Sequence, residues 1–120
     1  MKKILLIEDE KILSEMYAQK LVQENFTVLT AFEPFGGLEL ARKEKPDLVL
    51  LDILLPNENG IYFLEQLSQD SKISNIPVVV FSNYDDIETK KLALNMGAKE
   101  YLLKTSYTPK QVIEKIIKYL

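Results

Sequence analysis

Carboxylates, a hydroxyl and an amine each follow a short apolar run in this chain. Glu8 and Asp9 follow the first run, Asp52 follows LVLL, Ser82 follows VVVF, and Lys104 follows the last. Neighbouring carboxylates raise each other's pKa unless a cation lies between them, and Mg²⁺ suits a site that has few carboxylates and receives phosphate oxygens. A hydroxyl and an ammonium beside it would bind the arriving anion. The set therefore predicts a phosphoryl-transfer site with a carboxylate nucleophile.

Short apolar runs alternate with longer segments of helical period, which is typical of a parallel α/β sheet. The five runs are Ile4–Ile7, Thr27–Ala31, Leu48–Leu51, Val78–Phe81 and Tyr101–Leu103. The first, third and fourth read as strands buried on both faces, and the weaker second and fifth suit the sheet edges. Because the carboxyl ends of parallel strands share one edge, the polar residues at four of these ends should converge there.

A helix is expected after each strand, from residues that recur at helical spacing. The marker residues are Ile12, Leu13, Met16, Tyr17 and Leu21; Phe35, Leu38 and Ala41; Ile61, Leu64 and Leu67; Ile87, Lys91 and Leu94; and Val112, Ile113, Ile116, Ile117 and Leu120. Gly97 is expected to cap the fourth helix and Pro109 to lie in the first turn of the fifth. Residues 1–120 are expected to form one domain, with no linker or output domain.

The composition excludes several classes of protein. Apolar residues make up 47% and charged residues 28%, as in an ordinary globular protein. A net charge of −3 argues against nucleic-acid binding by the domain. Without Cys or His there is no disulfide, no histidine base and no histidine ligand, so any metal must be a hard, oxygen-bound cation. No segment approaches the roughly 18 apolar residues of a membrane span, so we expect a cytoplasmic protein without membrane contact.

The ordered set of strand-end residues resembles the receiver domain of two-component response regulators, the CheY-like proteins. The residues that carry the resemblance are Glu8-Asp9, Asp52 with Pro56 and Gly60 in DILLPNENG, Ser82, and Tyr101 with Lys104 in EYLLK. The resemblance extends over all 120 residues. It implies a flavodoxin-like (βα)5 fold, a doubly wound five-stranded parallel sheet with strand order 2-1-3-4-5.

The resemblance also implies how the site would work. Asp52 would accept a phosphoryl group from a sensor histidine kinase or a phosphotransfer protein. The domain would catalyse only its own phosphorylation and dephosphorylation. Mg²⁺ would be bound by Asp9 and Asp52, by Glu8 mainly through a water, and by the backbone carbonyl of Leu54. Lys104 would pair with Asp52 at rest and with the phosphoryl oxygens afterwards.

A switch is implied by the same resemblance. Ser82 would be drawn toward the phosphoryl group, and the ring of Tyr101 would turn inward into the space it vacates. The face made by the fourth helix, fifth strand and fifth helix would then change its affinity for a partner or for a second copy of the chain. In physical terms this is a two-state element biased by a local charge.

The chain departs from the family pattern at several positions. Thr105 follows Lys104 where the family usually has Pro, often after a cis peptide, and a cis bond before Thr would cost roughly 2.5–4 kcal/mol. Asn83 stands where a small residue is usual. Leu54 and Tyr84 are both bulky, and we hypothesise that they shield the acyl phosphate from water. Together with Asn83 they would tune the lifetime of the phosphate.

Two enzymatic or redox alternatives share part of this pattern. Haloacid-dehalogenase-type phosphatases also use a strand-end Asp with Mg²⁺, but they need a second carboxylate two residues later, where this chain has Leu54. A flavodoxin-like electron carrier needs a hydroxyl- and Gly-rich phosphate loop after the first strand. Here Glu8-Asp9-Glu10 would repel the phosphate.

A third alternative is a receiver-like interaction module that works without phosphorylation. Such a module would normally have lost Asp9, Asp52 or Lys104, and all three are present. Only Asn83 and Thr105 favour it. The sequence leaves open whether the domain acts alone or as part of a longer protein.

Overall fold

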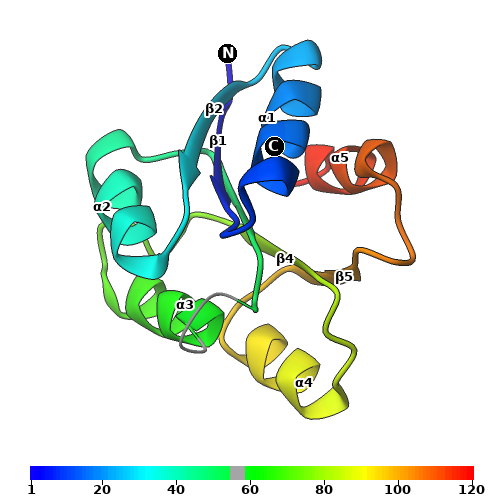
Figure 1. Cartoon of the computed structure of the whole chain (residues 1–120). Helices are drawn as coiled ribbons and strands as arrows, with labels where there is room; N and C mark the ends of the chain where they lie inside the picture. The colour runs from blue at the N-terminus through cyan, green and yellow to red at the C-terminus, as the bar shows by residue number, and fades with distance from the viewer. Residues whose placement is uncertain (55–58) are drawn as a thin grey trace.

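The computed structural model describes residues 1–54 and 59–120, which form alternating strands and helices (Figure 1). The strands are β1 (Lys3–Ile7), β2 (Thr27–Ala31), β3 (Leu48–Leu51), β4 (Val78–Ser82) and β5 (Glu100–Leu103). The helices are α1 (Lys11–Gln23), α2 (Pro34–Glu44), α3 (Asn59–Gln69), α4 (Ile87–Asn95) and α5 (Pro109–Ile117). Each strand begins and ends within one residue of its predicted bounds.

The strands form one parallel sheet in the order β2-β1-β3-β4-β5. This confirms the predicted doubly wound topology, with the two weaker apolar runs at the edges. The register pairs Ile7 with Leu51 and Ser82 with Leu103. The carboxyl ends of β1 and β3 therefore lie level, as do those of β4 and β5, while β4 extends two residues past its pairing with the end of β3. The residues that follow these ends meet at one edge.

Helices cover both faces of the sheet, with α1 and α5 on one side and α2, α3 and α4 on the other (Figure 1). Side chains of a strand point alternately to the two faces. Leu50 and Phe81 pack with Tyr17 of α1 on the first face, whereas Val80 packs with Phe63 of α3 on the second. Double-sided burial explains why β1, β3 and β4 are almost wholly apolar.

Not every marker of a helix faces the core. Ile12, Phe35 and Ile87 lie in the first turns of α1, α2 and α4, yet they are 77%, 64% and 68% exposed. These turns follow the strand ends, so no sheet lies beneath them to cover their side chains. The prediction was also wrong for Leu120, because α5 ends at Ile117.

Two glycines meet distinct backbone requirements. Gly97 has φ of 107° and follows the end of α4, as predicted for a cap. Gly60 lets the start of α3 approach the strand-end backbone, because a Cβ there would lie 2.5 Å from Cα of Ile53. This contact explains the glycine of the DILLPNENG motif, while Pro56 of the same motif lies outside the described residues.

Candidate functional site

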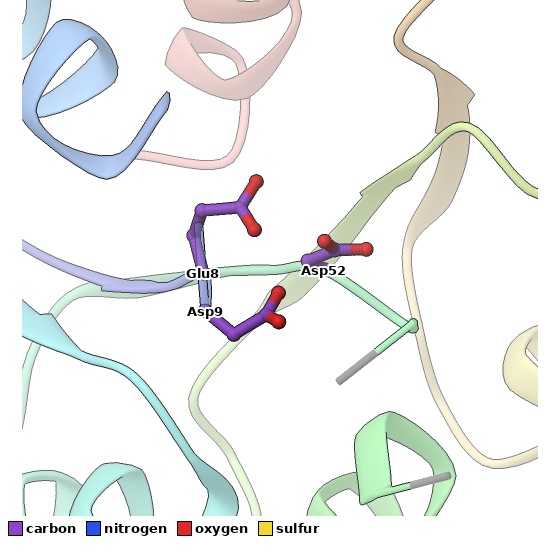
Figure 2. A group of neighbouring side chains, drawn as sticks. All are labelled: Glu8, Asp9 and Asp52. Carbon is purple, nitrogen blue, oxygen red and sulfur yellow. The ribbon is translucent and has the colours of Figure 1, made fainter. Parts of the chain in front are cut away.

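The acidic residues converge because β1 and β3 are neighbours and end level. The ladder continues past the strand ends, where the amide of Asp52 donates to the carbonyl of Ile7 at 2.9 Å. On the other side of β1, the amide of Glu8 donates to the carbonyl of Ala31 at 3.1 Å. These bonds fix the backbone from which Glu8, Asp9 and Asp52 project toward a common space (Figure 2).

The three carboxylates have the chemistry of a hard-cation site. Each offers one oxygen, and these oxygens lie within 4.8 Å of one another. Glu8 and Asp52 are buried, whereas Asp9 is exposed, so one side of the cluster is open to solvent. Carboxylate oxygens with room for retained waters fit Mg²⁺. The amide of Leu54 donates to Oδ1 of Asp52 at 3.0 Å and so orients that carboxylate.

Lys104 supplies the positive charge at this edge. Its Nζ lies 2.5 Å from Oε1 of Glu8 and 3.2 Å from Oδ2 of Asp52, and its side chain is only 10% exposed. The family resemblance implied the pair with Asp52, and the structure adds a shorter contact with Glu8. Lys104 follows β5, so it reaches Glu8 across the ends of β4 and β3.

Burial and neighbouring charges shift the pKa values of Glu8 and Lys104. Burial raises the pKa of Glu8 to about 7; the Lys104 ammonium opposes the rise and the Asp52 charge adds to it. For Lys104, burial lowers the pKa, but the contacts with Glu8 and Asp52 outweigh it and the pKa is raised. Lys104 is therefore an ammonium at neutral pH, while Glu8 is poised between its two forms.

Ser82 and Tyr101 both bind the peptide backbone of Tyr84. Ser82 is completely buried at the end of β4, and its Oγ accepts a hydrogen bond of 3.0 Å from the amide of Tyr84. The hydroxyl of Tyr101 donates to the carbonyl of Tyr84 at 2.6 Å. Tyr101 is only 8% exposed, so its side chain already occupies an inward position. One backbone residue thus connects the two predicted switch residues.

The residues expected to tune the site lie at its rim. Leu54 is 49% exposed and Tyr84 is 42% exposed. Both line a largely apolar groove of about 480 Å³ between α3 and α4, which also includes Ile53, Ile61, Thr89 and Leu92. Because Ile53 directly follows Asp52, the groove runs up to the site. Asn83 is exposed at the same edge.

Sequence reasoning missed an aromatic residue beside the lysine. Phe81 was assigned only to the apolar run of β4, but Nζ of Lys104 lies 4.6 Å from the centroid of its ring. The available signal was strand alternation. Phe81 pairs with Leu102 of β5, two residues before Lys104, so both side chains belong to the same face of the sheet.

Two further findings concern the backbone and the membrane. The peptide between Lys104 and Thr105 is trans, in contrast to the cis peptide often found at this position in the family. Within the parts of the chain that the structure describes, no helix combines the length and apolar character needed to cross a bilayer.

The sheet order and the strand-end acids define a CheY-like α/β signalling domain. Residues 4–117 match the response regulator receiver domain family, and the chain belongs to that family. It is therefore a receiver domain of the two-component type and neither a flavodoxin nor a dehalogenase-type phosphatase.

Individual relatives agree with this assignment. The chain is 40% identical over 100 residues to the uncharacterized transcriptional regulatory protein YcbL of Bacillus subtilis, covering 83% of this chain and 43% of that protein. It is 38% identical over 106 residues to Protein PilH of Pseudomonas aeruginosa, covering 87% and 86%. A CheY-like receiver domain protein from Methanospirillum hungatei superposes with a TM-score of 0.90 at 28% identity, covering 98% and 92%. The chain thus spans less than half the length of YcbL but most of PilH.

Proposed function

We propose that Asp52 is the phosphoacceptor of this receiver domain. The observation that carries the proposal is the buried Asp52 carboxylate, which lies 3.2 Å from the Lys104 ammonium and within the acidic cluster. An oxygen of Asp52 would attack the phosphorus of a phosphohistidine. The P–N bond would break with its electron pair going to the imidazole nitrogen, which would take up a proton from water as the new O–P bond forms.

The neighbouring residues would bind the charges that this transfer creates. Asp9 and Asp52 would hold Mg²⁺ through their carboxylates, Glu8 through a water, and Leu54 through its carbonyl. The ion would supply neutralisation of charge on the phosphoryl oxygens. Lys104 would contact the same oxygens from the buried side, since it reaches the site from β5. The domain would thus catalyse its own phosphorylation and dephosphorylation.

Ser82 would transmit the event to the rest of the domain. Its hydroxyl is bound to the Tyr84 amide, and donation to a phosphoryl oxygen would pull on that peptide. The Tyr101 hydroxyl donates to the carbonyl of Tyr84. A movement of the Tyr84 backbone caused by Ser82 would therefore shift the balance between positions of the Tyr101 ring. The face formed by α4, β5 and α5 would then change its affinity for a partner or a second copy.

The proposed partners follow from this chemistry. The phosphoryl donor is a sensor histidine kinase or a phosphotransfer protein. Such transfer requires a compartment with ATP, so we place the domain in the cytoplasm. Residues 1–120 are proposed to form one receiver domain, without direct contact to nucleic acid or membrane.

Phosphorylation can be tested directly. The purified chain is incubated with Mg²⁺ and acetyl phosphate, and intact mass is recorded at neutral pH. We expect a mass gain of one phosphoryl group that is absent in Asp52→Asn and without Mg²⁺. Asp47→Asn, an exposed carboxylate at the opposite edge, serves as a matched control and should be phosphorylated normally. Failure of the unaltered chain to gain mass would favour an interaction module that works without phosphate.

The rim residues give a second prediction, on the lifetime of the phosphate. Leu54→Asn combined with Tyr84→Ala should open the approach of water to the acyl phosphate and speed its loss by about tenfold, on the order of 1.4 kcal/mol of barrier. Phosphate release is followed after removal of the donor, with Asn83→Ala measured alongside. An unchanged release rate in the double variant would exclude shielding by these side chains.

A further inference from the structure

Lys104 crosses a flat aromatic surface before it reaches the acids. β5 is separated from β1 by β4 and β3, so the lysine stem must pass over the end of β4 to meet Glu8. Val79 and Phe81 of β4 both lie on that face; Phe81 is the one nearer the carboxyl end, and it is fully buried. The lysine Nζ lies 4.6 Å from the centroid of its ring, within the range of a cation–π interaction.

The Phe81 ring is itself packed against helix α1. Tyr17 of α1 packs against Phe81 with centroids 4.9 Å apart and ring planes at 79°, an edge-to-face arrangement. Tyr17 is only 2% exposed. This contact with α1 limits how far the Phe81 ring can move, so the ring offers a defined surface to the ammonium.

The geometry points to Phe81, supported by Tyr17, as a positioning residue for Lys104 in phosphoryl transfer. Glu8 and Asp52 attract the ammonium, but two anions on one side do not fix a flexible four-carbon side chain. The ring provides a third contact from below. It confines Nζ to the position from which it touches Glu8 and Asp52 together. This role rests on the proposed function of Asp52, and it concerns a residue that does not touch the phosphoryl group itself.

Graded weakening of the ring's negative face separates this role from core packing. Phenylalanine carrying one, two or three ring fluorines replaces Phe81. The fluorines nearly preserve the size and shape of the ring but withdraw electron density from its π face. The rate of phosphorylation by acetyl phosphate at saturating Mg²⁺ should fall stepwise, by about tenfold across the series. A core role alone predicts a flat series, and a flat series would overturn the inference.

Ordinary substitutions provide the matched pair. Phe81→Leu should slow phosphorylation by about tenfold. Phe63→Leu removes the same groups from the fully buried core on the opposite face and should leave the rate unchanged once folding is verified. Equal slowing in both variants would mean that packing alone is responsible and would overturn the inference.

A readout independent of phosphorylation tests the contact itself. In the unaltered chain, NMR should show an Overhauser effect between the Lys104 ε-methylene and the Phe81 ring, with upfield-shifted ε-protons. Their absence would overturn the inference whatever the kinetics. If the contact is present but the unaltered chain takes no phosphoryl group, the proposed function fails and the positioning role fails with it. If the unaltered chain is phosphorylated and the fluorine series is flat, only the positioning role fails.

Discussion

Ion pairs lie at both ends of the parallel strands, which we call the amino edge and the carboxyl edge of the sheet, but they differ in burial. At the amino edge, Lys3 lies 3.2 Å from Glu44 and Arg42 lies 3.0 Å from Asp70, with lysine and arginine side chains 40% and 47% exposed. At the carboxyl edge, Lys104 is 10% exposed. Exposed pairs are screened and contribute little, whereas buried charges carry a desolvation cost that only close partners offset. The fold concentrates this cost at the edge where we propose chemistry.

The largest effect is expected where the buried cation is removed. Lys104→Met leaves Glu8 and Asp52 facing each other without an ammonium. Phosphorylation should slow by about a hundredfold or more. The free energy of unfolding above pH 7 should fall by about 3–5 kcal/mol, because paired buried charges become unpaired. Acetyl phosphate kinetics and urea unfolding measure the two effects, and unchanged values for both would contradict the contrast between the edges.

Glycines at the two edges should also differ. In Gly60→Ala the new Cβ would meet the backbone of Ile53. The Ile53 backbone and the start of α3 must then separate, at a cost of about 2–3 kcal/mol. Gly97 lies before β5 at the amino edge, and a Cβ there meets nothing within 4 Å. Gly97→Ala should cost only about 1–2 kcal/mol, from its positive φ. Denaturant unfolding of both variants tests the order, which equal losses would contradict.

The pH dependence of stability offers a third test. The pKa of Glu8 rises on folding from 4.5 to about 7, so the folded state binds this proton more tightly than the unfolded state. Stability from this group is therefore present below pH 4.5 and is lost as pH rises toward 7. Asp70 at the amino edge has a lowered pKa, caused first by the hydrogen bond from Arg42, so its contribution is lost as pH falls.

Unfolding is measured in metal-free buffer across the range between the two pKa values of Glu8, 4.5 and about 7. The free energy of unfolding should decrease as the pH rises through this range. Glu8→Gln has no such proton to lose and should flatten the slope. Asp70→Asn should leave it unchanged, and a slope that persists in Glu8→Gln would assign the titration to another group.

The smallest effect is expected at the exposed pairs. Arg42→Met removes the partner of Asp70, and the half-buried Asp70 carboxylate keeps some contact with solvent. The free energy of unfolding should change by less than about 1 kcal/mol, and by still less at high salt. Phosphorylation should be unaffected. A loss as large as that of Lys104→Met would show that exposure does not separate the two edges.

Much of this arrangement could be predicted from the sequence. Uninterrupted apolar runs gave β1, β3 and β4, because burial on both faces leaves no alternation to obscure them. Since strand ends of a parallel sheet share an edge, the convergence of Glu8, Asp52 and Lys104 followed as well. Predicting which residues follow the strands required no knowledge of side-chain conformation.

What escaped prediction depends on how side chains reach across strands. The contact of Lys104 with Glu8 crosses two intervening strands, and no local pattern records which of two acids a flexible amine approaches more closely. Phe81 was hidden because an aromatic residue in a buried strand is already explained by packing. Tyr101 was expected to turn inward only after phosphorylation, whereas it is already buried here, with its hydroxyl donating to a backbone carbonyl in the loop after β4.

The order of strands has a consequence for the biosynthesis of this domain. Glu8 and Lys104 are separated by 96 residues in the sequence, so the acids emerge from a ribosome long before the lysine that balances them. Domains fold as units during or after synthesis, with the N-terminal parts available first. The mutual repulsion of the acids is relieved by Lys104 only when β5 has joined the sheet. The proposed phosphoacceptor site is thus complete only when the strand that is synthesised last has joined the sheet.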